Sequence, residues 1–203
     1  MSARQVQSFW VGIIVAVNLL YSVAQADPAA STAADPEKLI AQAQQALDRE
    51  ELDTAVKLYQ QAAELNSTTA QVYMGEFANS AQFYEEAVGW FLMAASQGNP
   101  AAQFDLAQMY VAGTGIEKDD AKALYWFRRS ADKNYLPSVK VVSNAYRLGQ
   151  YGLKVDLDKA KSWDAKASRL EAIEQKATAE KMAAYLAEQK KLQEEAAKKA
   201  NNK

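Results

Sequence analysis

The sequence of 203 residues contains neither cysteine nor histidine. Without them the chain cannot build a Ser-His-Asp triad, a cysteine nucleophile, a zinc or haem site with His or Cys ligands, or a disulfide. We therefore expect no cofactor, no metal and no enzyme activity, although carboxylate, lysine and hydroxyl chemistry remain open.

Glycine and proline are also scarce, with eight and four residues. Alanine, glutamate, glutamine, lysine and leucine, which favour helices, dominate instead, so the composition predicts an all-α protein. The formal net charge of −2 provides no basic surface. Nucleic acid is therefore excluded as an expected partner.

An almost uninterrupted apolar run, residues 9–20, follows a polar start that carries Arg4. Ala24 and Ala26 then stand at the two positions that a signal peptidase reads. An uncleaved anchor is the alternative, but the run is shorter than the roughly 20 apolar residues that span a bilayer. We expect residues 1–26 to be a signal peptide cleaved after Ala26, and the mature chain to be periplasmic or secreted, without membrane insertion.

The rest of the chain is organised in repeats. Residues 27–35 lack apolar periodicity and predict a flexible linker. Four helix-turn-helix units follow: Pro36–Asn66, Thr68–Gly98, Pro100–Asn134 and Pro137–Ser168. Their second helices carry small, aromatic and small residues at positions i, i+4 and i+7: Ala55, Tyr59 and Ala62; Ala87, Phe91 and Ala94; Ala123, Phe127 and Ser130-Ala131; Ala160, Asp164 and Ala167. This spacing predicts one face on which a neighbouring helix packs closely, with Asp164 departing from it.

Motifs in the units resemble two related repeat families. The first two units resemble tetratricopeptide repeats. In the second of them Gly75 stands where two helices cross most closely, and the first has Ala43 in its place. The next two resemble Sel1-like repeats through a longer string of matches: Ala102, Leu106, Ala107, Tyr110, Gly113, Gly115, Ile116, Asp119, Lys122, Ala123, Trp126, Phe127, Ser130 and Ala131, repeated as Ser138, Val142, Ser143, Tyr146, Gly149, Gly152, Leu153, Asp156, Lys159, Ala160, Trp163 and Ala167. The ending of the second unit also looks like the close of a Sel1-like repeat. The resemblance implies an all-α, right-handed superhelical solenoid of antiparallel helix pairs over residues 36–169.

The acidic residues and tryptophans have structural interpretations. Asp119 and Asp156 precede second helices, where a carboxylate caps free N–H groups. The remaining acids cluster at turns or early in helices, as do Glu85 and Glu86, and none forms a calcium loop. Trp90, Trp126 and Trp163 recur at matched positions and predict interhelix packing rather than a sugar platform.

The C-terminal segment, residues 170–203, is rich in alanine and charge. No glycine or proline interrupts the chain after Asp156, so we expect one helix of about 30 to 40 residues. Leu170, Ile173 and Ala177 continue the preceding apolar stripe and predict a cap on the open end of the stack. Beyond Met182 the segment is predicted to be a solvated helix, with a coiled coil as the alternative.

The repeat resemblance implies that the first helices line a concave surface for peptides or proteins. By analogy with tetratricopeptide repeats, the groove residues are Val72, Glu76, Asn79, Phe104, Gln108, Val111, Lys140, Asn144 and Arg147. An aromatic ring, amides and two cations there predict an acidic or C-terminal peptide as ligand. These positions could equally be ordinary exposed helix residues.

The predicted function is a non-catalytic scaffold or adaptor of the bacterial cell envelope, which binds a protein or peptide partner. Two alternatives remain. A carboxylate-based envelope polysaccharide or cell-wall hydrolase would need two facing acids beside exposed aromatics. A structural element would assemble through its C-terminal helix.

Overall fold

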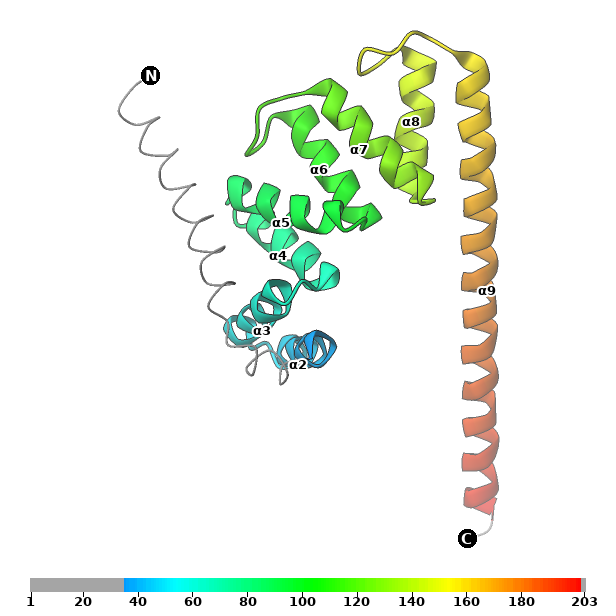
Figure 1. The fold of residues 1–203 in the computed structure, drawn as a ribbon. Helices are drawn as coiled ribbons and strands as arrows, with labels where there is room; N and C mark the ends of the chain where they lie inside the picture. Colours follow the sequence, from blue (N-terminus) through cyan, green and yellow to red (C-terminus); the bar gives the residue numbers. More distant parts are fainter. Residues whose placement is uncertain (1–34, 202–203) are drawn as a thin grey trace. The chain divides into compact units, whose positions relative to one another are not determined.

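The computed structural model describes residues 35–201, and the side chains of residues 35–194 (Figure 1). The expected signal peptide, its cleavage after Ala26 and nearly all of the expected linker lie outside these residues. Every regular element of the described part is an α-helix, which confirms the all-α prediction. No helix of this part is both long and apolar enough to cross a membrane.

The described chain forms antiparallel helix pairs in two compact units, divided between Asn66 and Ser67. The first unit contains one pair, α2 (Pro36–Asp48) and α3 (Leu52–Glu64). The second unit contains the other helices: α4 (Thr68–Ser80), α5 (Tyr84–Ser96), α6 (Pro100–Ala112), α7 (Asp120–Asp132), α8 (Leu136–Leu148) and α9 (Leu157–Asn201). Within it, α4 pairs with α5, α6 with α7 and α8 with α9, while α5 contacts α6 and α7 contacts α8. This is the predicted solenoid of helix pairs.

Side-chain caps fix where several helices begin. The carboxylate of Asp119 accepts a hydrogen bond from the backbone N–H of Lys122 at 2.9 Å, and Asp156 accepts one from Lys159 at 2.9 Å. Each satisfies a donor that the first helical turn leaves free. The structural interpretation of these two acids is therefore confirmed.

The predicted small and aromatic residues of the second helices are the core of the repeats. All are buried except Asp164, which keeps 48% of its side chain exposed. The first helix of each pair supplies a small residue opposite, and Gly75 shows why: a Cβ there would lie 2.6 Å from Cε1 of Phe91. That distance is well inside van der Waals contact, so the helices cross as closely as predicted.

Left-handed backbone ends the first helices of the last two pairs. Gly113 and Gly149 close α6 and α8 with φ of 73° and 66°. Side chains with a Cβ resist this conformation, so the two glycines permit the loops that lead to α7 and α9.

Helix α9 joins the last repeat to the C-terminal segment without a break at residue 170, and its 45 residues exceed the expected length. Figure 1 shows it continuing far beyond the start of α8, which runs antiparallel to it. Leu170 packs against the core, but Ile173 is 58% exposed and Ala177 is also exposed. The predicted cap therefore ends at Leu170, because α8 offers no surface to the turns beyond it.

Candidate functional site

The predicted groove residues of the second unit lie on its three first helices, α4, α6 and α8. Between α4 and α6 the surface is hollowed by an open pocket of about 240 Å³. Eight residues line it: Glu76, Asn79, Phe91, Asp105, Gln108, Met109, Ala112 and Thr114. Three of the predicted residues, Glu76, Asn79 and Gln108, are thus brought together at one depression.

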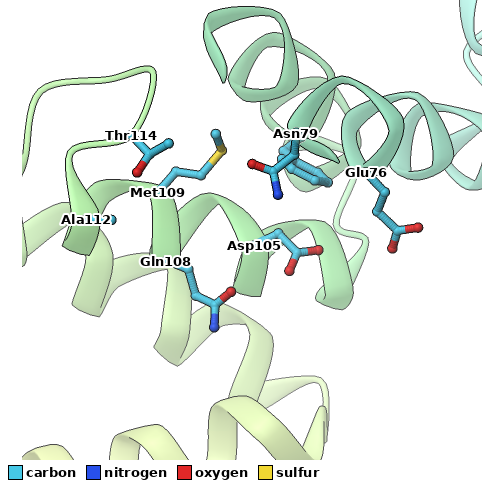
Figure 2. A pocket seen from close by; sticks show the side chains of 8 residues that line it. Glu76, Asn79, Asp105, Gln108, Met109, Ala112 and Thr114 are labelled. Atoms are coloured by element: carbon cyan, nitrogen blue, oxygen red, sulfur yellow. The ribbon is translucent and has the colours of Figure 1, made fainter. Parts of the chain in front are cut away.

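Figure 2 shows how the polar side chains of the pocket are arranged. Glu76 and Asn79 come from α4 and lie across from Asp105 of α6, while Gln108 of α6 extends away from α4. Glu76, Asn79 and Gln108 are exposed, while Phe91 and Met109 are 2% and 6% exposed and form an apolar floor. The site combines an apolar base with carboxylate and amide groups at its rim.

Asp105 is a pocket residue that the sequence interpretation missed. Burial, and then the negative charge of Glu76, raise the pKa of Asp105 to about 6. Because perturbed carboxyl groups cluster at functional sites, this group marks the pocket as a candidate site. A signal was available: Asp105, Gln108, Met109 and Ala112 follow the i, i+3, i+4, i+7 spacing of one helix face.

Phe104 stands beside the pocket rather than in it. Its ring is half-buried and its centroid lies 5.6 Å from those of both Phe127 and Tyr135. These are edge and tilted contacts that stabilise aromatic clusters. Phe104 of α6 therefore packs against α7 and against Tyr135, the residue that precedes α8.

The three predicted residues of α8 make contacts within the chain. Lys140 forms an ion pair with Glu171 of α9 at 2.7 Å, and Arg147 forms one with Asp164 at 2.6 Å. Arg147 also donates a hydrogen bond to the side chain of Asn144. The two cations that suggested an acidic ligand are thus each balanced by a carboxylate of α9.

The acidic clusters give no support for a metal site. In the part of the chain that the structure describes, no group of three or more acidic residues could hold a metal ion. The pocket does contain two carboxylates, but its aromatic lining residue, Phe91, is buried against Gly75. No sugar-stacking ring therefore flanks Glu76 and Asp105 among the lining residues.

Two of the three tryptophans pack as predicted. Trp90, Trp126 and Trp163 are all half-buried, and Trp126 and Trp163 lie against the hydrophobic core. Cations cover two of the rings: Arg129 lies 5.6 Å from the centroid of Trp126, and Lys166 lies 5.1 Å from that of Trp163. These contacts occupy ring faces that a carbohydrate would need.

Comparison with known proteins gives consistent matches. The Sel1 repeat family matches residues 48–67, 84–99, 100–135 and 143–171, so Sel1-like sequence also appears in the two units that resemble tetratricopeptide repeats. An uncharacterised protein of Neisseria meningitidis serogroup B is 34% identical over 108 residues, which cover 53% of this chain and 22% of that protein. The DAP3-binding cell death enhancer 1 of Rattus norvegicus is 32% identical over 83 residues, which cover 40% of this chain and 16% of that protein. The chain thus spans about a fifth of the length of these relatives.

Two solved structures share the fold. A Sel1 repeat protein from Oxalobacter formigenes superposes with a TM-score of 0.63 and 27% identity, over 70% of this chain and 43% of that one. A protective antigen of uropathogenic Escherichia coli with an SLR fold gives a TM-score of 0.55 and 27% identity, over 67% of this chain and 33% of that one. Proteins of this kind generally mediate protein–protein interactions on a non-catalytic scaffold. With its helix pairs, close-packed small residues and family matches, this chain belongs to the Sel1-like repeat family.

Proposed function

We propose that this protein is a non-catalytic adaptor of the bacterial cell envelope that binds a partner protein through the first-helix surface of its second unit. The observation that carries the proposal is the pocket between α4 and α6, where Glu76, Asn79 and Gln108 present polar groups beside an apolar floor. A concave site with a few converging polar groups is typical of a binding surface. The envelope location rests on the leader-like sequence of residues 1–26.

The groove residues contribute in different ways in this proposal. Glu76, Asn79 and Gln108 contact the partner directly. Phe104 shapes the wall of the groove from a half-buried position. Lys140 and Arg147 fix α8 to α9, because both cations are paired with carboxylates of α9, and Asn144 accepts a hydrogen bond from Arg147.

The experiment is a pull-down from periplasmic extract with the tagged protein. We compare it with the double variant Asn79→Arg, Gln108→Arg, which fills the pocket mouth with two long side chains. The control variant, Ser162→Arg, Ala165→Arg, adds the same charge at exposed positions of α9. We expect a protein retained by the parent and control to be lost from the pocket variant. Equal retention by all three would contradict binding at this surface.

A second candidate function, assembly through the C-terminal helix, is favoured by one observation. Beyond residue 171 almost every described side chain of α9 is exposed, including four large apolar ones on one side: Met182, Tyr185, Leu186 and Leu192. We expect sedimentation equilibrium to detect this assembly as a mass above that of the monomer. Met182→Gln, Leu186→Gln would then restore the monomer, whereas groove binding would be unchanged.

A further inference from the structure

The pocket between α4 and α6 has a charge that nothing in the described chain balances. Its two ionisable lining residues, Glu76 and Asp105, are both acidic. Neither carboxylate takes part in any ion pair or side-chain hydrogen bond identified among residues 35–194. By contrast, Lys140 and Arg147 on α8 are both paired. The unbalanced charge of this surface is therefore negative.

Neighbouring groups respond to this negative charge. The charge of Glu76 contributes to raising the pKa of Asp105 and, after burial, that of Tyr73. After burial, Asp105 and then Glu76 also raise the pKa of Tyr135. Tyr73, Tyr135 and the two acids are neutral or negative near pH 7, so no cation among them offsets the field. A positive group placed in the pocket would be attracted to the negative charge of Glu76 and would stabilise the ionised form of Asp105.

We propose that the pocket between α4 and α6 binds a lysine or arginine side chain of the partner segment, which rests on the adaptor function proposed above. The rim supplies acceptors that suit such a side chain, namely the carboxylates of Glu76 and Asp105 and the amide oxygens of Asn79 and Gln108. An ammonium carries three N–H donors and a guanidinium five, with no acceptor on either. Hydrogen bonds between these charged partners are stronger than neutral ones.

The apolar floor favours a long cationic side chain over a small cation. Phe91 and Met109 lie at the base of the pocket and offer apolar surface with no polar atom able to hold an ion strongly. The methylene stem of lysine or arginine packs on such surface while its charged end reaches polar groups. An acidic side chain would instead bring like charge toward Glu76 and Asp105.

The test uses synthetic peptides Ac-Ala-Ala-Xaa-Ala-Ala-NH2, with Xaa as Lys, Arg, Gln or Glu. NMR follows the backbone amides of α4 and α6 and the side-chain carboxyl of Asp105 in the full protein. We expect saturable shifts with the Lys and Arg peptides, and a fall of about one unit in the titration midpoint of Asp105 when the site is filled, since a bound cation favours the ionised form. Equal shifts with the Gln peptide, or no saturable shift with any peptide, would overturn the proposal.

A charge-neutral variant separates this inference from the adaptor function. Glu76→Gln, Asp105→Asn keeps the size of both side chains, and we expect it to weaken Lys-peptide binding at least about tenfold. Glu85→Gln, Glu86→Gln removes the same charge from the exposed first turn of α5 and should leave binding unchanged. If this pocket variant still captures the partner that Asn79→Arg, Gln108→Arg loses, the adaptor stands and the basic-ligand proposal fails. If the Lys peptide binds but no partner is captured, the adaptor function fails while the ligand chemistry of the pocket stands.

Discussion

Arg147 and Asp164 form an ion pair of 2.6 Å at the place where the other repeats have a close-packed aromatic ring. Asp164 also accepts a hydrogen bond of 2.5 Å from Ser143, the residue that corresponds to Gly75. The hydroxyl of Ser143 and then the guanidinium of Arg147 hold the pKa of Asp164 below its ordinary value. In the last pair, a polar cluster therefore replaces the small and aromatic residues that join the helices elsewhere.

Because Asp164 and Ser143 act together, we expect them to be replaceable only together. Asp164→Phe alone should lower the melting temperature, since Arg147 loses its carboxylate and the ring meets the Ser143 hydroxyl. Ser143→Ala, Asp164→Phe restores the small and aromatic pair found at Ala107 and Phe127, and should recover most of the loss. Thermal unfolding of the two single variants and the double variant measures this coupling. Purely additive effects would contradict the exchange of one pair for the other.

Two helical glycines are expected to affect stability in opposite directions when they are replaced by alanine, because Gly75 lies at a close helix crossing and Gly89 does not. Gly75→Ala should lower the free energy of unfolding by about 1–3 kcal/mol, because its Cβ would lie 2.6 Å from Phe91. Gly89→Ala should raise it by about 0.5–1 kcal/mol, because no atom lies within 4 Å and alanine favours the helix. Urea unfolding measures both. A stabilised Gly75→Ala variant would show that the crossing relaxes without cost.

Two buried hydroxyls form a chain in the core of the third and fourth pairs. Ser138 donates to Ser130 at 2.7 Å, and Ser130 donates to the carbonyl of Pro100 at 2.6 Å. Ser130→Ala should cost about 1–2 kcal/mol of unfolding free energy, because Ser138 then lacks its acceptor. Adding Ser138→Ala should remove part of this cost, since no hydroxyl is left unpaired. Urea unfolding at one pH measures both variants, and an equal or larger loss in the double variant would contradict this reasoning.

Local signals in the sequence were sufficient to predict much of the fold. The caps at Asp119 and Asp156 follow from residue type and from position at the start of a helix. The close approach at Gly75 follows from the resemblance to tetratricopeptide repeats. The predicted cap at Ile173 was wrong because the stripe pattern carries no information on where α8 begins. Since α8 and α9 are antiparallel, the start of α8 decides which turns of α9 have a partner surface.

The candidate site was less predictable because it depends on contacts between helices. Glu76, Asn79 and Gln108 were found by analogy between repeats, but the burial of Asp105 depends on α4 lying beside it. The pairing of Lys140 with Glu171 joins residues of different helices, and no local pattern identifies it. For this reason the sequence predicted an acidic ligand, whereas the ligand that we propose for the pocket is basic.

The raised pKa of Asp105 makes the stability of the protein depend on pH in a defined direction. Its ordinary value is 3.8 and its value in the folded protein is about 6, so the folded state holds this proton more tightly than the unfolded state. The ionisation of Asp105 therefore makes no contribution to the free energy of unfolding below about pH 3.8. It becomes increasingly destabilising as the pH rises to about 6, and is fully present above that value.

Asp105→Asn removes this dependence, since asparagine does not titrate. We expect the variant to gain about 1–2 kcal/mol of unfolding free energy relative to the parent at pH 7, and little at pH 4, after allowing for solvent screening of the partly exposed carboxyl. Urea unfolding at both pH values provides the measurement, with the exposed Asp132→Asn as the control for loss of one charge. A gain that is equal at pH 4 and pH 7 would mean that packing of the amide, and not the charge of Asp105, sets the stability of the pocket.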